Sequence, residues 1–357
     1  MKRLSIAVLV VLVIAVTLAW LNRAEIGLRL VDRLVARNLA SNLLDELPDG
    51  LHVALCGSGS PLPDPGRAEP CVAIAAGSRV YVVDAGSGGT RNLQLMRIPV
   101  GRIDAILLTH FHSDHIDGLG ELLMQRWVNG THDSPTPVYG PPGVERVVAG
   151  FDQAYALDAV YRVAHHGVET VPPSGAGGTA REFAAPADGA PTVVLERDGL
   201  TITAFRVNHF PIVPAVGYRF DYAGRSVVVS GDTVQSAELT RMAKGADVLV
   251  HEALSRQLVR RINAAAQAAG RANLVKITAD ILDYHTSPTE AAQVASDAGV
   301  GHLLYYHIVP PLPIEPLEVV FLEGVDEVWD GPVTIGTDGK MLSLPAGSDD
   351  IVERDLL

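Results

Sequence analysis

The stretch that decides the fold is "LLTHFHSDHIDGLG", residues 107–120. The apolar run "AILL" at 105–108 predicts a buried strand, and three histidines and two aspartates follow it within eight residues. A single tetrahedral zinc rarely takes four ligands from so short a segment, whereas two metals can share it. We therefore expect one metal to bind His110 and His112, and a second to bind Asp114 and His115.

Three other strand-like runs also end in residues that can bind a metal. "FRVNH" ends at His209, "SVVVSGD" at Asp232 and "LLYYH" at His307. A carboxylate such as that of Asp232 can bridge two cations about 3.5–4 Å apart. The sequence thus predicts a dinuclear centre with two Zn²⁺ per chain. Its ligands are expected to be His110, His112 and His209 on one metal, Asp114, His115 and His307 on the other, and Asp232 between them.

The motif "HFHSDH" resembles the His-x-His-x-Asp-His motif of the metallo-β-lactamase fold. The order of the later ligands, with "VDAG" at 83–86 and "HTSPTEAA" at 285–292, is similar to the ribonuclease Z branch. The stretches "CGSGSPLPDPGRAEPC" and "YYHIVPPLP" are more similar to arylsulfatase-like hydrolases of the same fold. The resemblance covers about residues 51–345 and implies an αββα sandwich, an α/β fold.

The resemblance also implies roles for single residues. Asp114 would bind metal and orient or deprotonate the nucleophile, and Asp84 would support the metal-binding loop. His285 would assist the leaving group, with a histidine favoured by a helix C-terminus as the alternative. His251 would support a ligand or would be a core histidine.

Charge and spacing bear on the substrate. Long-armed ribonuclease Z enzymes carry a tRNA-gripping insertion before the bridging aspartate, whereas here only 23 residues separate His209 from Asp232. The net charge is −13, which disfavours a nucleic-acid ligand. We therefore expect hydrolysis of a small anionic ester, a phosphodiester or a sulfate ester. The alternatives are tRNA 3′-processing of the ribonuclease Z type and lactone or thioester hydrolysis. Relatives of this kind often dimerise, so a homodimer is one option.

The N-terminus indicates attachment to a membrane. Leu4–Leu21 contains no charged residue and reaches about 27 Å as a helix, close to the thickness of a bilayer. Basic residues at positions 2 and 3 favour a cytoplasmic N-terminus. Residues 1–22 are expected to be a transmembrane anchor, with a cleaved signal segment as the alternative. The hydrolase domain would then be exported, to a periplasmic or extracellular face.

The remaining chain divides by pattern. We expect an amphipathic linker helix at 23–50, the hydrolase domain at 51–345 and an acidic tail at 346–357. Further helices are expected around 272–283 and at 288–298, and a surface loop that shapes a lid at 171–192. Cys56 and Cys71 could form a disulfide. Two small buried side chains without a bond between them are an equally good interpretation.

Overall fold

The computed structural model describes residues 2–40 and 42–357, and the side chains of residues 7–36 and 42–357. The chain forms two units, an N-terminal unit that ends at Glu46 and a body, Leu47–Leu357. The body contains all of the residues proposed above as metal ligands.

The N-terminal unit is helical. It contains α1 (Lys2–Leu21), α2 (Arg23–Ala40) and the 3₁₀ helix η1 (Leu43–Glu46). Among its described residues, no single helix is long and apolar enough to cross a membrane. Ala7–Leu21 and Arg23–Ala36, bent by 69° at their junction, meet the length and composition requirements only as a pair. The predicted transmembrane helix is therefore not confirmed, and the anchor stays a prediction.

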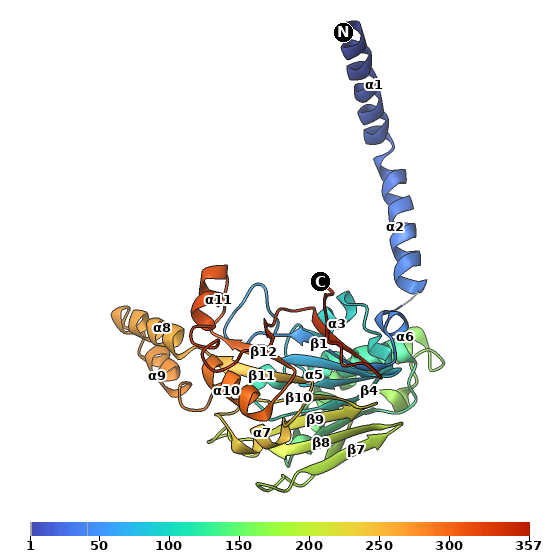
Figure 1. Cartoon of the computed structure of the whole chain (residues 1–357). Helices are drawn as coiled ribbons and strands as arrows, with labels where there is room; N and C mark the ends of the chain where they lie inside the picture. The colour runs from blue at the N-terminus through green and yellow to red at the C-terminus, as the bar shows by residue number, and fades with distance from the viewer. Residues whose placement is uncertain (1, 41) are drawn as a thin grey trace. The chain divides into compact units, whose positions relative to one another are not determined.

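Two mixed sheets make up the body, and Figure 1 shows them lying one above the other. The first sheet has the spatial order β15 (Val352–Asp355), β14 (Lys340–Pro345), β1 (Gly50–Gly57), β2 (Cys71–Ala76), β3 (Arg79–Val83), β4 (Ile103–Leu107), β5 (Thr136–Gly140) and β6 (Gly178–Glu182). The second has the order β13 (Val333–Ile335), β12 (His302–Val309), β11 (Val248–Leu254), β10 (Arg225–Val229), β9 (Val216–Tyr222), β8 (Leu200–Arg206) and β7 (Thr192–Arg197).

The main core lies between the sheets. Leu55 from the first sheet and Phe220 and Tyr306 from the second belong to one fully buried cluster. A second core lies between the second sheet and the helices α7 (Ala237–Met242), α10 (Pro288–Ala298) and α11 (Glu315–Phe321). Because both faces of the central strands are covered, these strands consist of nearly continuous apolar residues.

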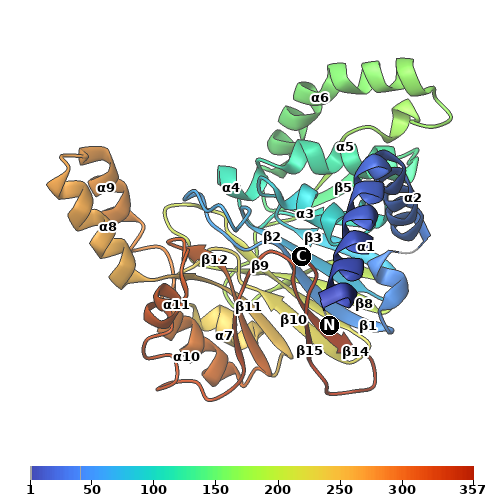
Figure 2. The same cartoon turned by 90° about the horizontal axis from the view of Figure 1, so that it is seen from above.

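Helices also pack on the first sheet. They are α3 (Gly89–Leu95), α5 (Leu119–Gly130) and α6 (Val144–His166), and α5 and α6 contact β5. Figure 2 shows α3, α5 and α6 on the side of the body opposite α7, α10 and α11. The predicted αββα arrangement of an α/β fold is thus present. α10 begins with the predicted capping box of Ser287 and Glu290.

Several segments differ from their sequence patterns. The predicted loop 171–192 contains the 3₁₀ helix η3 (Pro173–Gly175) and β6, and the acidic tail 346–357 contributes β15. β6 and β15 are short polar edge strands, formed by pairing with β5 and β14 rather than by an apolar alternation of their own. α8 (Arg256–Ala268) was not predicted, and α9 (Ala272–Asp280) ends three residues before the predicted boundary at 283.

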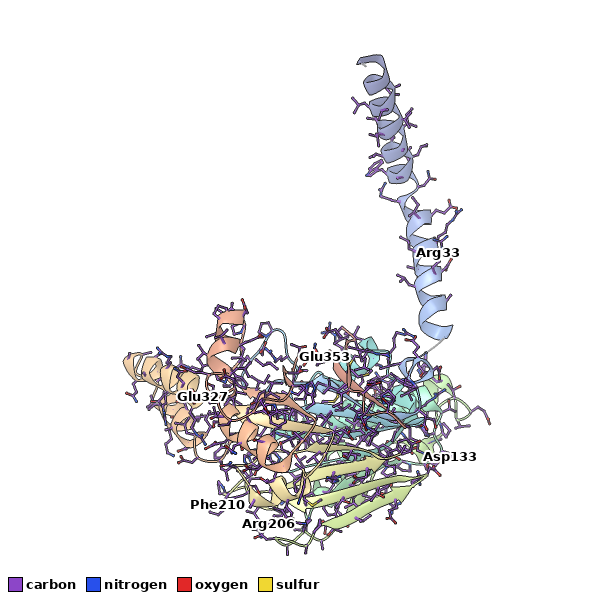
Figure 3. The ribbon with its side chains drawn as sticks, viewed as in Figure 1. Arg33, Asp133, Arg206, Phe210, Glu327 and Glu353 are labelled. Carbon is purple, nitrogen blue, oxygen red and sulfur yellow. A yellow bond between two sulfur atoms is a disulfide. The ribbon has the colours of Figure 1, made fainter. Side chains whose placement is uncertain are left out.

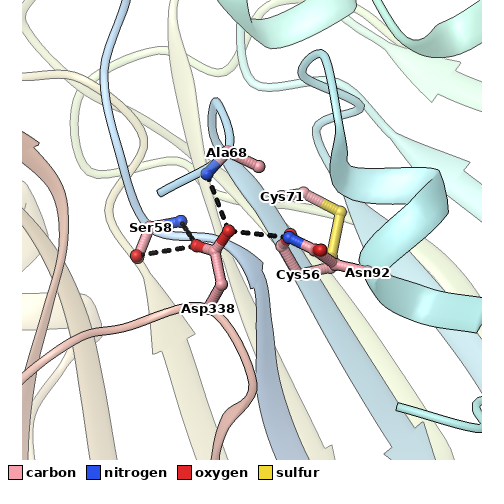
Figure 4. The surroundings of a disulfide bond; sticks show 6 residues. All are labelled: Cys56, Ser58, Ala68, Cys71, Asn92 and Asp338. Carbon is pink, nitrogen blue, oxygen red and sulfur yellow. Dashed lines mark hydrogen bonds between the residues drawn. A yellow bond between two sulfur atoms is a disulfide. The ribbon is translucent and has the colours of Figure 1, made fainter. Parts of the chain in front are cut away.

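The two cysteines form a disulfide between the neighbouring strands β1 and β2 (Figure 4). This resolves the two alternatives that the sequence left open. The disulfide closes the chain at both ends of the loop 58–70, which follows β1 and precedes β2.

The half-buried carboxylate of Asp338 binds the same loop. Oδ1 of Asp338 accepts hydrogen bonds from the backbone N–H and the hydroxyl of Ser58, both at 2.9 Å (Figure 4). Oδ2 accepts from the N–H of Ala68 and from Nδ2 of Asn92, both at 2.7 Å. Asp338 therefore fixes both ends of the loop to the first sheet.

Asp338→Asn tests this role. An amide presents an NH₂ donor where the carboxylate accepts, so at least two donors lose their acceptor, and each costs about 1–3 kcal/mol when it is left unsatisfied. We expect the free energy of unfolding, measured by urea denaturation, to fall by about 2 kcal/mol or more. The exposed Asp349→Asn is the matched control. Equal unfolding midpoints for the two variants would contradict the assigned role.

Candidate metal centre

The predicted ligands meet at one edge of the two sheets. Asp84 follows β3, the 107–120 stretch follows β4, His209 follows β8 and Asp232 follows β10, while His307 lies in β12. β3 and β4 are parallel, as are β10, β11 and β12. Because parallel strands end at the same edge of a sheet, this topology brings together residues that are distant in sequence.

A first group contains His110, His112, His209 and Asp232. Nδ1 of His112 lies 3.0 Å from Nε2 of His110 and 3.4 Å from Nε2 of His209. Oδ2 of Asp232 lies 3.8 Å from Nε2 of both His110 and His209. Around a tetrahedral zinc with bonds near 2.1 Å, ligand atoms are about 3.4 Å apart. The four donors therefore have the spacing of a metal site.

A second group contains Asp114, His115 and His307. Oδ2 of Asp114 lies 3.5 Å from Nε2 of His115 and 3.2 Å from Nε2 of His307. Oδ2 of Asp232 lies 3.4 and 3.3 Å from the same two nitrogens. The Asp232 carboxylate thus lies close to both groups, and its predicted role as a bridging ligand stays a prediction.

Unusual backbone conformations set the direction of two side chains, those of His307 and Asp84. In the pairing of β11 with β12, Glu252 faces Tyr306 and Ala253 faces Ile308, so His307 is the extra residue of a β-bulge. His307 has φ 44° and Asp84 has φ 57°, both in the left-handed region that side-chain-bearing residues seldom adopt. Such strained conformations persist only where the surrounding structure holds them, and they are found most often at functional sites.

Asp84 is hydrogen-bonded to the loop that follows β4. It is 1% exposed, and its Oδ2 lies 2.8 Å from Nδ1 of His115. Oδ1 accepts from the N–H of Thr109 and Oδ2 from its hydroxyl, both at 2.8 Å. With Nδ1 of His115 held by a carboxylate, Nε2 is left to face a metal. The supporting role predicted for Asp84 stays a prediction.

His285 lies at the edge of the centre and contacts a residue that sequence reasoning missed. Its Nδ1 is 3.2 Å from Oε1 of Glu252, which is fully buried. The same oxygen accepts hydrogen bonds from the N–H groups of Thr233 and Thr286, at 3.3 and 3.0 Å. The available signal was an acidic residue within the buried apolar strand "VLVHEAL".

His251 is buried within the same strand. Its Nδ1 lies 2.7 Å from the carbonyl oxygen of Glu252, and its Nε2 has no hydrogen-bond partner among the described residues. This geometry includes no hydrogen bond to a predicted ligand within the described part of the chain. Its predicted supporting role stays a prediction.

The ligand histidines differ in the direction in which their pKa values are shifted. Burial lowers the pKa of His110, His112 and His209, in the case of His209 to about 4. Burial also opposes protonation of His115 and His307, but the Asp232 and Asp114 carboxylates outweigh it. The pKa of His307 is raised to about 9 and that of His115 well above its usual range.

The residues present fit a pair of zinc ions. Nε2 of His115 and Oδ1 of Asp232 are buried and have no hydrogen-bond partner among the described residues. Buried polar atoms of this kind indicate a missing partner, and imidazole and carboxylate donors are typical zinc ligands. Each predicted ligand lies in one of the two groups described above.

A pocket opens onto the metal centre. It is lined by Asp114, Asp232, His285 and His307, and by an apolar wall that consists of Leu62, Ile277, Ile281 and Val309. Tyr284 adds an aromatic ring, and no Lys or Arg is among the described residues that line the pocket. The metal centre is therefore the expected source of positive charge for an anionic group bound here.

A second hollow includes His209 in its lining. It is lined by residues 185–187, which belong to the predicted lid, and by residues 206–210 and 212–216. Phe210, the neighbour of His209, is 73% exposed, and Figure 3 shows it with Arg206 at the surface of the body. The predicted lid segment thus borders the centre beside His209.

Comparisons with known proteins bear on this site. A family model described as "Beta-lactamase superfamily domain" matches residues 79–308. A protein named Ribonuclease Z from Mycobacterium avium (strain 104) is 39% identical over 281 residues, which are 78% of this chain and 90% of that protein. A Ribonuclease Z from Mycobacterium bovis (strain BCG / Pasteur 1173P2) is 39% identical over 265 residues, 73% of this chain and 87% of that protein.

Solved structures share the fold. The metallo-β-lactamase fold protein YhfI from Bacillus subtilis has a TM-score of 0.58 and 21% identity, over 82% of this chain and 99% of that one. The short form of human tRNase Z has a TM-score of 0.57 and 20% identity, over 82% of this chain and 99% of that one. At these identities the likeness is one of fold.

Metal binding should release protons. In the metal-free protein, His115 and His307 are protonated at pH 7 because their pKa values are raised, and a metal binds only the neutral imidazole. His110, His112 and His209 are already neutral at that pH. We expect zinc uptake at pH 7 to release about two protons, all from the second group, and zinc affinity to rise with pH up to about 9.

Titration calorimetry in buffers of different ionisation enthalpy measures this release. An enthalpy that does not depend on the buffer would contradict it. The replacement His307→Ala removes one of the two titrating groups and should lower the number of released protons by about one.

The support from Asp84 can be tested separately. Asp84→Ala removes the acceptor that holds His115, and such changes typically weaken metal binding by about 10- to 100-fold. Competition with a zinc-binding dye measures the affinity. Asp104→Asn, on β4 but paired with Arg79 away from the centre, is the matched control. Equal zinc affinities in the two variants would argue against the supporting role.

Proposed function

The chain belongs to the metallo-β-lactamase superfamily, in its ribonuclease Z branch, and from this membership we propose that it is a phosphodiesterase that cleaves RNA at a centre of two zinc ions. The observation that carries the proposal is the convergence of five histidines and two aspartates in adjoining clusters of ligand atoms, onto which a pocket opens. The relatives named Ribonuclease Z, matched over about 90% of their length, support RNA as the substrate.

This changes the preference drawn from the sequence. The short interval between His209 and Asp232 and the net charge of −13 favoured a small anionic ester. The comparisons support the ribonuclease Z alternative better, and a phosphodiester ahead of a sulfate ester. A missing insertion at one position does not exclude another RNA-binding surface elsewhere.

Each of the two groups of ligands is proposed to hold one cation. His110, His112 and His209 would hold one, Asp114, His115 and His307 the other, and Asp232 both. When bound, two cations lower the pKa of water and offset the charge that develops on a phosphoryl group. Because the ligands come from both sheets, the pocket keeps its geometry only while the sheets stay packed.

Asp114 is proposed to orient the attacking water and accept its proton. Burial raises the pKa of this carboxyl, but His115 and the hydrogen bond with His307 outweigh it and lower the pKa below its usual range. The carboxylate is therefore ionised at neutral pH. Its position in the pocket places it beside the reacting group.

His285 is proposed to give a proton to the leaving oxygen. Its Nδ1 lies 3.2 Å from the buried Glu252 carboxylate, which orients the ring, while the ring lines the pocket. Glu252 does not line the pocket and would act on the leaving oxygen through His285, so it is a positioning residue.

A second candidate function is the hydrolysis of a small anionic ester by a protein whose hydrolase domain lies outside the cytoplasm. The absence of Lys and Arg from the described pocket lining suits a small substrate held by the metals alone. A Cys56–Cys71 disulfide is typical of oxidising compartments, which agrees with the predicted export of the hydrolase domain on a membrane anchor. Cell fractionation with a reporter fused to the C-terminus tests that location.

The substrate experiment uses the zinc-loaded full chain with a 3′-extended tRNA precursor, bis(p-nitrophenyl) phosphate and p-nitrophenyl sulfate. We expect cleavage of the RNA and of the phosphodiester, with kcat lowered about 10²-fold or more by Asp114→Ala. Cleavage of the sulfate alone would favour the small-ester candidate. Zinc-loaded protein that cleaves none of the three would contradict the proposal.

The role of His285 predicts a dependence on the leaving group. A sugar alkoxide leaves poorly without a proton, whereas p-nitrophenolate needs little assistance. We expect His285→Ala to lower kcat about 10²- to 10⁴-fold on RNA but only slightly on bis(p-nitrophenyl) phosphate. Glu252→Gln should show the same pattern more weakly. An equal loss on both substrates would indicate a structural or metal-binding role instead.

A further inference from the structure

The helices α8 and α9 form a hairpin beside the pocket, and both views show it extending from the edge of the body (Figures 1 and 2). Side-chain bonds hold the two helices together. Nδ2 of Asn263 on α8 donates to the carbonyl oxygen of Val275 and to the hydroxyl of Thr278, both on α9, at 2.7 and 2.8 Å. The hairpin is therefore an ordered element.

The base of the hairpin is part of the pocket. Val259 on α8 packs with Leu254 and Val309, and Leu62 and Ile281 pack against this cluster. Leu62, Ile281 and Val309 also form the apolar wall of the pocket, to which α9 adds Ile277. One set of contacts thus anchors the hairpin and places it at the mouth of the metal centre.

The hairpin carries a charge opposite to that of the chain. The chain has 28 basic and 41 acidic residues, but residues 256–284 contain five basic and only two acidic ones. Lys276 pairs with Asp280, and Arg256 pairs with Glu290. The remaining basic residues are exposed and have no carboxylate partner among the described residues; they are Arg260, Arg261 and Arg271.

We propose that the α8–α9 hairpin binds the sugar-phosphate backbone of the RNA substrate next to the scissile bond. Unpaired, exposed guanidinium groups bind phosphates and release counterions when they do so. Ile277, Ile281 and Tyr284 offer an apolar and aromatic surface for a base beside the reacting phosphate. This inference rests on the proposed function and deepens it, because it names the surface that would select RNA.

The surroundings explain why such a surface is needed. The described lining of the pocket has no Lys or Arg, so the pocket itself gives little attraction to phosphates beyond the scissile one. The net charge of −13 repels a polyanion at long range. Positive charge on the hairpin, whose base lines the pocket, would offset this repulsion beside the centre.

The test compares two charge reversals of equal size in the full chain. Arg260→Glu/Arg261→Glu changes the hairpin, and Arg91→Glu/Arg146→Glu changes exposed arginines on α3 and α6. All four positions are exposed, so the fold should tolerate either double replacement. Affinity is measured by fluorescence anisotropy with a labelled, phosphorothioate-linked RNA hairpin that has a single-stranded 3′ tail. Hydrolysis of bis(p-nitrophenyl) phosphate is measured in parallel.

We expect the hairpin variant to bind RNA about tenfold more weakly at low salt and the control to change by less than about twofold. The slope of log Kd against log salt should fall by about 1.4 for two lost contacts with a single strand. Hydrolysis of the small ester should be unchanged in both. Equal weakening by both variants, or a wild type that does not bind the RNA, would overturn the inference. Absence of hydrolysis by the wild type would instead contradict the proposed function, because the role of the hairpin is measured by binding alone.

Discussion

The arrangement depends on one buried carboxylate. Oδ2 of Asp232 lies within 3.8 Å of the Nε2 atoms of four histidines, and the residue is 2% exposed. Burial alone would raise the pKa of this carboxyl, but His307 and His115 outweigh it and hold the pKa well below its usual range. A buried anion of this kind is stable only among positive partners, protons on imidazoles or metal cations.

The fold supplies those partners by bringing strand ends together. Asp232 follows β10, and the four histidines come from the stretch after β4, from the end of β8 and from a bulge in β12. These strands belong to both sheets, so the interlayer core also fixes the site. Asp84 then fixes one ring from behind, with a backbone conformation that side-chain-bearing residues seldom adopt. The unusual backbone conformations of Asp84 and His307 thus help to direct side chains at one carboxylate.

The sequence was most informative where chemistry constrains it most. The 107–120 stretch and the ligands at the ends of apolar runs predicted the members of both groups, and Ser287 and Glu290 predicted the start of α10. Glu252 was missed because its function depends on a partner, His285, that is 33 residues away in sequence. β6 and β15 were missed because a neighbouring strand, and not their own pattern, makes them strands.

The preferred substrate was harder to infer from the sequence than the ligands were. A net charge is an average over the whole surface, and the value of −13 conceals a basic hairpin at the mouth of the pocket. An absent insertion between two motifs likewise says nothing about elements elsewhere in the chain, here α8 and α9 between His251 and His285. Charge therefore has to be placed on the fold before it can decide between a small ester and RNA.

We propose that Asp232 bridges two metal ions held by the two groups of ligands. Crystals of the zinc-loaded protein, measured on both sides of the zinc absorption edge, locate these ions. We expect two anomalous peaks about 3.5–4 Å apart, one against His110, His112 and His209 and one against Asp114, His115 and His307, with the Asp232 carboxylate between them. A single peak, or peaks that do not contact Asp232, would refute the bridging role.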